Sequence, residues 1–330
     1  MDALLFDGTF FVGLKASKLY KELVKREMTQ TKSGLTLNVK KAYLAVLAAE
    51  KNRDILTRNI NNLQKTLNET RAIYEEGFAE KLDVDRLQLS LQNLQTEAEN
   101  VDRSLQTLRN VLKFRMGYPM EEGIELTDDL DDLVERTLMA GNGLDAPFDI
   151  TRRPEYRVLE QAEKLNEVNI RRFQVGYLPS LYGFASYSRA LQANDLSQAR
   201  WFPTTLVGAS LNVPIFDGFN KQAKIQKARI DLERTRLQRN RFARSTRLEV
   251  TNTRIAYLNA LETLQNREKT VQLAEDIYET TRIKYREGVG SSVEVNQAES
   301  ELYQSQGNYI QALYELVLAQ VDLEKALGNF

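Results

Sequence analysis

The sequence predicts a mainly α-helical protein with a small antiparallel β part. Apolar residues recur at alternating intervals of three and four over long stretches without proline, which is the spacing of helices packed as in a coiled coil. Between residues 177 and 216 the period changes to two, which is typical of β-strands. The pattern of the first half recurs in the second half, 211 positions later. Tyr74 and Tyr285, for example, occupy equivalent positions of the two repeats. We therefore expect two long α-helical hairpins and a few strands.

The duplication is clearest at two glycine-centred segments, 74–84 and 285–295, in which Tyr, Glu, Gly and Val recur in register. Glycine has no side chain and tolerates positive φ, so Gly77 and Gly288 each indicate a tight turn between two helices. The hairpin tips are accordingly expected at residues 75–83 and 287–294.

The helices that lead away from the tips carry regular heptad seams. At 1.5 Å per residue, a continuous helix from Gly218 to Arg286 is ~100 Å long, whereas the return helix from Ser292 to Leu327 is about half of that. The return helix therefore leaves about half of the long helix without a packing partner. A predicted helix from Arg152 to Val175 can pack against that half. The seam positions are Val84, Leu87, Leu91, Leu94, Ala98, Val101, Leu105, Leu108 and Leu112 in the first repeat, and Val295, Ala298, Leu302, Ser305, Tyr309, Ala312, Leu316, Ala319, Leu323 and Ala326 in the second.

In chain order the sequence divides into six segments. Residues 1–8 are the remnant of a first-repeat strand, 9–117 the first long hairpin, 118–151 an acidic connector, 152–176 the short helix of the second repeat, 177–216 two β-strands, and 217–330 the second long hairpin. The connector gathers seven carboxylates between residues 121 and 132, which favours a solvated linker with one short helix over an ion site.

The two expected strands are Leu181–Ser188 and Leu206–Val213. In the second, Val207, Ala209, Leu211 and Val213 share one face. Such strands suit either a membrane barrel, where roughly 9–11 residues cross the hydrocarbon, or a small soluble hairpin packed on helices. Two strands and a stub leave open edges, so we expect several copies to close one shared barrel. The candidate membrane-interface aromatics are Tyr177, Tyr182, Tyr187, Trp201 and Phe202.

Composition excludes several kinds of chemistry. The chain has no Cys and no His, and no nucleophile–base pair, metal-ligand cluster or phosphate loop is present, so we expect no enzyme, no cofactor and no metal. The 45 basic and 46 acidic residues balance, which gives no reason to expect a nucleic-acid partner. The basic run from Lys221 to Arg247 contains one aromatic residue, Phe242, which favours a pore-lining or solvated helix surface over nucleic-acid binding.

Several short motifs resemble those of one family. Phe-Asp-Gly recurs at Phe6 and Phe216, Arg-Pro-Glu begins at Arg153, and Leu-Pro-Ser-Leu begins at Leu178. Their order, together with the glycine-centred tips, resembles the TolC-type outer-membrane efflux proteins over essentially the whole chain.

This resemblance implies a homotrimer whose 12-stranded barrel lies in the outer membrane of a Gram-negative bacterium. A long α-helical barrel would continue it across the periplasm. It also implies a passive exit duct for tripartite efflux pumps or type I secretion systems. The partners would be a periplasmic adaptor (membrane fusion) protein, an inner-membrane transporter of the RND or ABC type, and outer-membrane lipid.

The resemblance further assigns roles to the tips. Carboxylates just beyond a tip would form the periplasmic aperture, which gives Asp83 and Glu294, with Gln297 at a further position that is acidic in the family. The competing interpretation is a solvated acid at a helix start, favoured by the helix dipole. The adaptor-docking residues would be Glu76, Gly77, Phe78, Ala79, Glu287, Gly288, Val289, Gly290 and Ser291.

The first repeat lacks a part that the second repeat has. A helix and a strand precede Phe216, whereas almost nothing precedes Phe6. A family member would carry a signal sequence, a helix and a strand there, so we expect an N-terminally truncated member. The alternative function is a soluble coiled-coil scaffold or tether without pore activity, which would have no use for strands flanked by aromatic residues.

Overall fold

The computed structural model describes residues 2–139, 147–192 and 200–330. The chain divides into two compact units. Unit 1 consists of residues 1–31 and 151–245, and unit 2 of residues 32–150 and 246–330. Helices α1 (Gly8–Glu75) and α5 (Asn220–Arg286) contribute to both units. The predicted fold class, mainly helical with a small antiparallel sheet, is confirmed.

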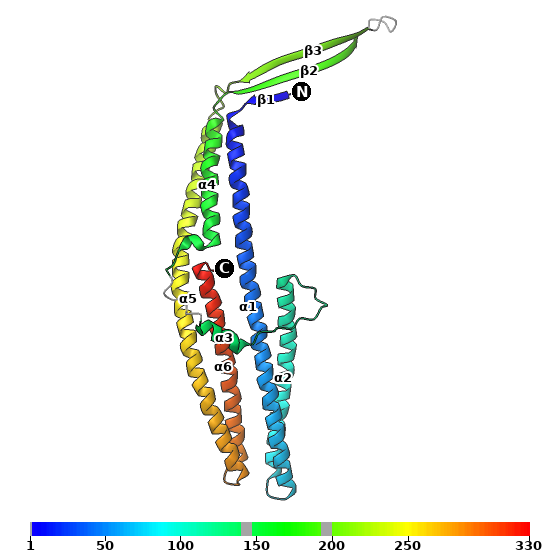
Figure 1. Cartoon of the computed structure of the whole chain (residues 1–330), viewed down its shortest axis with the longest axis vertical. Coiled ribbons are helices and arrows are strands. Elements are labelled where there is room, and N and C mark those ends of the chain that lie inside the picture. Colours follow the sequence, from blue (N-terminus) through cyan, green and yellow to red (C-terminus); the bar gives the residue numbers. More distant parts are fainter. Residues whose placement is uncertain (1, 140–146, 193–199) are drawn as a thin grey trace. The chain divides into compact units, whose positions relative to one another are not determined.

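Unit 1 contains the sheet, which has the strand order β1-β2-β3 (Figure 1). Strand β1 (Asp2–Phe6) pairs with β2 (Ser180–Gln192), and β2 pairs with β3 (Arg200–Asn212), both antiparallel. The strands are longer than the sequence indicated, because β2 extends to Gln192 and β3 begins at Arg200, so that Leu191 pairs with Trp201. Pro203 is tolerated there because β3 is an edge strand. The sequence also predicts a polar loop from Gln192 to Gln198, most of which lies outside the described residues.

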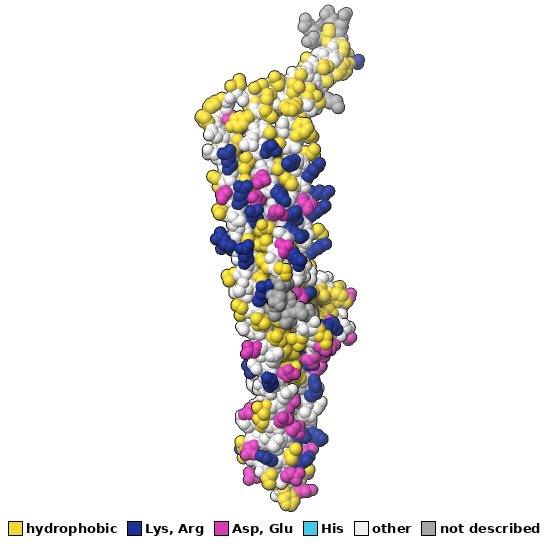
Figure 2. Space-filling view, turned by 60° about the vertical axis from the view of Figure 1, so that its left-hand side comes forward, with side chains coloured by type: hydrophobic (Ala, Val, Ile, Leu, Met, Phe, Trp, Pro, Cys, Tyr) yellow, Lys and Arg dark blue, Asp and Glu magenta, His cyan; other side chains and the backbone are white. Residues whose placement is uncertain are grey.

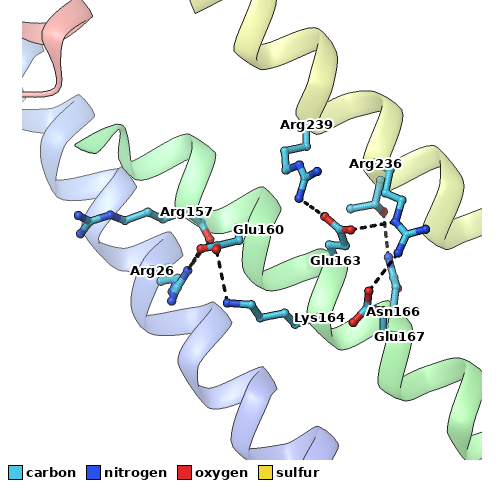
Figure 3. A network of polar contacts seen from close by, with 10 residues as sticks. Arg26, Arg157, Glu160, Glu163, Lys164, Asn166, Glu167, Arg236 and Arg239 are labelled. Atoms are coloured by element: carbon cyan, nitrogen blue, oxygen red, sulfur yellow. Dashed lines mark hydrogen bonds and ion pairs between the residues drawn. The ribbon is translucent and has the colours of Figure 1, made fainter. Parts of the chain in front are cut away.

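Acidic residues of α4 (Pro154–Val175) connect it to both long helices of unit 1. Glu160 accepts a hydrogen bond from Arg26 of α1 at 3.1 Å. Glu163 accepts from Arg236 and Arg239 of α5, at 2.9 Å and 2.5 Å (Figure 3). The helix begins at Pro154, two residues later than predicted, because residues 150–152 form a separate turn of 3₁₀-helix. Helix α4 thus lies between α1 and α5, which supports its predicted role as their second partner.

Unit 2 contains the two hairpins. Hairpin 1 is residues 32–75 of α1 with α2 (Lys81–Met116), and hairpin 2 is residues 246–286 of α5 with α6 (Ser292–Leu327). Each is closed by an apolar seam. The buried members of the predicted seams are Leu87, Leu91, Val101, Leu105 and Leu112 in α2 and Val295, Ala298, Leu302, Ser305, Ala312, Leu316, Leu323 and Ala326 in α6.

The acidic connector is fixed to unit 2 rather than solvated along its whole length. Its short helix α3 (Leu130–Met139) buries Leu130 and Val134 in the largest apolar cluster, which α1, α5 and α6 also build. The Tyr43 hydroxyl donates to Asp128 at 2.6 Å, and Lys51 lies 3.5 Å from Asp129. Burial raises the pKa of Tyr43 to about 12, and the Asp128 carboxylate acts in the same direction. Part of the connector's charge therefore has a structural role.

Both hairpins end in the same way, which makes the duplication visible in the backbone. Gly77 and Gly117 in the first repeat and Gly288 and Gly328 in the second adopt left-handed conformations, with φ between 68° and 83°. Helix α1 continues without a break through Ser33 and Gly34. Among the described residues, we find no helix with both the length and the apolar composition needed to cross a membrane.

The balanced charge of the chain is the sum of two opposite charges. Unit 1 contains 22 Lys and Arg against 12 Asp and Glu, a net charge of +10, whereas unit 2 contains 23 against 34, a net charge of −11. Lys and Arg side chains accordingly gather over the helices of unit 1 on the face shown in Figure 2. The even composition predicted no such segregation.

Candidate functional site at the hairpin tips

The two tips have the same backbone geometry. At the first, the Gly77 N–H donates to the Tyr74 carbonyl at 2.9 Å, and the Phe78 N–H donates to the Ile73 carbonyl at 3.0 Å. At the second, Gly288 and Val289 make the equivalent bonds, both at 3.0 Å. This is the Schellman closure of a helix. In it, a hydrophobic residue after the glycine usually packs back onto the last turn.

The residue after each glycine is instead exposed. Phe78 is 82% exposed and Val289 is 78% exposed. The next positions, Ala79 and Gly290, are both small. A Cβ at Gly290 would lie 3.0 Å from the Tyr285 backbone nitrogen, so the second tip leaves little room for a larger residue. Both tips thus present one apolar side chain from a tight turn.

The remaining predicted tip residues, Glu76, Glu287 and Ser291, are exposed as well. Together with the two glycines and the two apolar residues, they form a polar surface around a small apolar centre at each tip.

The predicted aperture carboxylates stabilise helix starts. Asp83 Oδ2 accepts from the Glu80 backbone N–H at 3.3 Å, and Glu294 Oε2 accepts from the Ser291 N–H at 3.4 Å. Each of these bonds is part of a capping box at the start of its helix, and a negative charge there also suits the helix dipole. Gln297 Nε2 donates to Glu301 at 2.7 Å. The competing interpretation, an acid at a helix start, therefore describes both carboxylates in the single chain.

Polar contacts join the two hairpins near the tips. The Ser292 hydroxyl of α6 donates to Asp83 of α2, and Arg86 Nη1 lies 3.4 Å from the same hydroxyl. Further along, Asn59 Nδ2 of α1 donates to Gln306 Oε1 of α6 at 2.8 Å. Sequence reasoning missed these contacts, although a signal existed: Ser292, Glu299 and Gln306 repeat at intervals of seven, which places polar residues on one face of α6.

Two tyrosines of α5 add to this polar contact. Tyr278 is hydrogen-bonded to Thr66 of α1, and Tyr285 is hydrogen-bonded to Thr70. Thr66 and Thr70 are buried, at 5% and 1% exposure. Hydroxyls with partners can be buried at little cost, whereas unpaired ones cannot.

Glu299 lies on the same face of α6, between the contacts of Ser292 and Gln306. It is 2% exposed and accepts a hydrogen bond from the Tyr303 hydroxyl at 2.6 Å. Burial raises the pKa of the Glu299 carboxyl to about 7, and the hydrogen bond from Tyr303 only partly opposes this effect. The polar contact between the hairpins therefore contains a carboxyl that titrates near neutral pH.

The expected membrane-interface aromatic residues do not all lie on one face of the sheet. Tyr187 and Trp201 lie on the same face of the β2–β3 pair, with exposures of 62% and 63%. Tyr182 and Phe202 lie on the opposite face, because they occupy positions of the other parity in the register. Tyr177 precedes β2, and its ring lies 5.3 Å from the Lys221 ammonium. The membrane-interface girdles stay a prediction.

The described residues contain no group of three or more acidic side chains that could hold a metal ion. The described residues of the tips therefore offer exposed apolar side chains and capping bonds, and a titratable carboxyl lies nearby in α6.

Comparison with known proteins shows which family the chain resembles. The sequence profile of the family "Outer membrane efflux protein" matches residues 150–329. The toluene efflux pump outer membrane protein TtgC of Pseudomonas putida is 25% identical over 308 residues, covering 91% of this chain and 61% of the relative. The outer membrane protein TolC of Vibrio cholerae is 22% identical over 336 residues, covering 98% and 74%. The protease secretion protein PrtF of Dickeya chrysanthemi is 22% identical over 318 residues, covering 94% and 63%.

Solved structures agree in fold. The outer-membrane channel OprN matches with a TM-score of 0.78 at 20% identity, covering 99% of this chain and 73% of that one. The outer membrane protein VceC of Vibrio cholerae matches with a TM-score of 0.77 at 17% identity, covering 97% and 76%.

The profile match extends over more than half of the chain and therefore defines the class of protein to which the chain belongs. The chain belongs to the outer membrane efflux protein family. This confirms the predicted resemblance and the localisation in the outer membrane of a Gram-negative bacterium, extending into the periplasm. The chain spans about three fifths of the length of the first curated relatives, 61% of TtgC.

Proposed function

We propose that the complete protein is a homotrimeric channel of the outer membrane that serves as the passive exit duct of a tripartite efflux pump or a type I secretion system. The observation that carries this proposal is the uncovered apolar face of the β2–β3 pair. On that face Val207 is 73% exposed and Leu211 is 64% exposed. Both strands have 13 residues, and roughly 9–11 suffice to cross the hydrocarbon of a bilayer. Lipid is the partner that such a face requires.

The open edges of the sheet support the trimer. Among the described residues, strands β1 and β3 each have one neighbour, so each leaves an unpaired edge. Unpaired edges in a bilayer cost several kcal/mol per unsatisfied group, and closure into a barrel removes them. Three copies that share one barrel would satisfy both edges of every chain.

The tips support coupling to other components of the pump. Phe78 and Val289 are exposed at equivalent positions of the two repeats, so a trimer would present six apolar tips. A periplasmic adaptor protein would dock there, with the inner-membrane transporter of the RND or ABC type supplying the energy. Asp83 and Glu294, with Gln297 nearby, would form rings of carboxylates at the periplasmic aperture, which attract cations.

Two measurements test this function. The full-length protein, expressed in a Gram-negative host, should be found in the outer-membrane fraction and should give single-channel conductance in planar bilayers. Recovery as a soluble periplasmic or cytoplasmic protein without conductance would contradict the channel and favour a coiled-coil scaffold.

The docking role is tested separately. Phe78→Asp should abolish export by the assembled pump while membrane insertion and conductance stay unchanged. Phe114→Asp is the matched control, because Phe114 is 79% exposed but lies at the other end of α2. Equal loss of export in both variants would argue against docking at the tips.

A further inference from the structure

The β2–β3 pair carries a charge on its apolar face. Alternate residues of a strand share a face, so the register of the pair assigns Arg189 to the same side as Val207 and Leu211. Arg189 is also the single charged residue among residues 181–191 and 201–211. The opposite side offers several small polar neighbours instead, namely Ser186, Ser188, Thr204, Ser210 and Asn212. A charge that lies among apolar side chains rather than among polar ones indicates a specific partner.

The position of Arg189 along β2 corresponds to one edge of an apolar band. Leu181 and Leu191 lie on this face ten residues apart, which is ~33 Å of extended chain. Strands of membrane barrels tilt by roughly 35–45°, so this length crosses an apolar band of about 25 Å. Arg189 precedes Leu191 by two residues and therefore lies near one end of the band. This is the end farther from α4, which ends at Val175, shortly before β2 begins at Ser180.

Tyr187 orients the Arg189 side chain on this face. The Arg189 Nε donates a hydrogen bond to the Tyr187 hydroxyl at 2.8 Å, and the guanidinium carbon lies 6.0 Å from the centre of the Tyr187 ring. These are the contacts of Arg189 with other described residues, and neither brings a carboxylate to it. A guanidinium has five N–H donors, so four remain on Nη1 and Nη2 for an anion.

The chemistry of this group favours a phosphate as the counter-ion. A planar guanidinium binds phosphate oxygens through two parallel N–H bonds, and it is more weakly hydrated than an ammonium, which suits a site beside hydrocarbon. Trp201 and Tyr187 are 63% and 62% exposed on the same face, and such rings favour the level of the lipid headgroups. A headgroup phosphate would therefore meet this face at the level of Arg189.

We propose that Arg189, oriented by Tyr187, binds the phosphate of an anionic lipid whose headgroup carries a phosphate monoester. The acyl chains of this lipid would lie on the apolar face below the guanidinium, against Val207. The inference rests on the proposed membrane barrel and names the class of lipid that the barrel binds. With the helices in the periplasm, the end of β2 that is farther from α4 lies in the outer leaflet, so this leaflet supplies the lipid.

Fluorescence of Trp201 can report the lipid at this site, because Trp201 is the single Trp of the sequence and lies on the same face. The protein is reconstituted in phosphatidylcholine bilayers that contain either dibromo-phosphatidylcholine or dibromo-phosphatidic acid, whose bromines quench a tryptophan in contact. We expect about a fivefold preference for phosphatidic acid, the magnitude for one basic residue at an anionic lipid surface. Trp201→Phe should abolish the quenching signal.

Variants of the two contact residues test the assignment. Arg189→Gln should remove the preference, while quenching by dibromo-phosphatidylcholine stays unchanged. Tyr187→Phe keeps the ring but not the hydroxyl, so it should lower the preference by a smaller factor. The matched control is Arg244→Gln, at an exposed position of α5 ~36 Å from the start of that helix, and it should keep the full preference. A preference that persists in Arg189→Gln, or that falls equally in Arg244→Gln, would overturn the site.

Native mass spectrometry gives an independent measurement that does not depend on Trp201. The protein in detergent is incubated with lipid A, a glycolipid of outer membranes that carries phosphate monoesters, or with phosphatidylcholine. The Arg189→Gln variant should retain about fivefold less lipid A than the natural chain and the same amount of phosphatidylcholine. Equal retention of lipid A by both would contradict the site.

The outcomes separate this lipid site from the proposed channel. Equal quenching by the two brominated lipids, with single-channel conductance intact, would overturn the phosphate site and leave the channel. Absence of quenching by either lipid, without conductance, would show that the β2–β3 pair does not lie in a bilayer and would overturn both.

Discussion

Unit 2 contains two kinds of helix contact that differ in chemistry. Within each hairpin, the seam is apolar: Leu63 and Leu67 of α1 pack against Leu87 and Leu91 of α2. Between the hairpins, the contact near the tips is polar, with Asn59 donating to Gln306 and Ser292 to Asp83.

The difference indicates which contact can open. Apolar burial contributes roughly 25 cal/mol per Å² and is lost when water enters, so each hairpin should remain a rigid element. A hydrogen bond contributes only about 0.5–1.5 kcal/mol net, because water replaces the partner. Movement at the tips should therefore separate hairpin from hairpin and leave each hairpin closed.

The largest effect is expected inside a hairpin. Leu87 is 1% exposed in the α1–α2 seam, so Leu87→Ala should lower the free energy of unfolding by about 2–5 kcal/mol through lost burial and a cavity. Thermal denaturation followed by circular dichroism measures this. Leu89→Ala, at a position 59% exposed on the same helix, should change stability by under about 0.5 kcal/mol. Equal losses of stability in Leu87→Ala and Leu89→Ala would contradict the conclusion that the apolar seam holds the hairpin together.

The next effect concerns pH and the buried Glu299. Its pKa is raised from 4.5 to about 7, so the folded state holds the proton more tightly than the unfolded state. This stabilisation is complete below pH 4.5 and is lost as the pH rises to about 7, in total roughly 3 kcal/mol. Glu299→Gln should flatten the curve of stability against pH in this window, whereas exposed Glu301→Gln should not. Parallel curves for Glu299→Gln and the natural chain would rule out this role.

A smaller effect is expected at the turn that closes hairpin 2. Gly288 has a φ of +77° and no atom near an added Cβ, so Gly288→Ala should cost about 1–2 kcal/mol through backbone strain alone. Gly307 lies within α6, also with no atom nearby, so Gly307→Ala should stabilise the chain by about 0.5–1 kcal/mol. Chemical denaturation measures both. The same sign for both substitutions would contradict the strain at the turn.

The smallest effect is expected between the hairpins. Ser292→Ala removes the hydrogen bond to Asp83 and should cost about 0.5–1.5 kcal/mol. Hydrogen exchange should become faster at residues 76–83 and 287–294 and stay unchanged along the apolar seams. Ser300→Ala, exposed on the same helix, is the control. Faster exchange along the seams instead would show that the hairpins open internally.

The sequence predicted the helices, the tips and the seams because these follow from local periodicity and from two glycines. It did not predict the polar contact between the hairpins, since Asn59 and Gln306 are 247 residues apart and meet only when particular helix faces come together. The strand ends were misplaced because Trp201 gains its extended conformation from pairing with Leu191. The capping role of Glu294 could have been predicted from Ser291, three residues before it.

The opposite charges of the two units have a practical consequence for handling the protein. The net charge of −1 suggests weak binding to any ion exchanger at pH 7. Unit 1, with a net charge of +10, and unit 2, with a net charge of −11, can however each bind a matrix of opposite charge. The purified protein should therefore bind both cation and anion exchangers at low salt and elute from each as salt screens its charges. Solubility near pH 6, the calculated isoelectric point, should also depend strongly on salt, because oppositely charged units of different molecules attract one another.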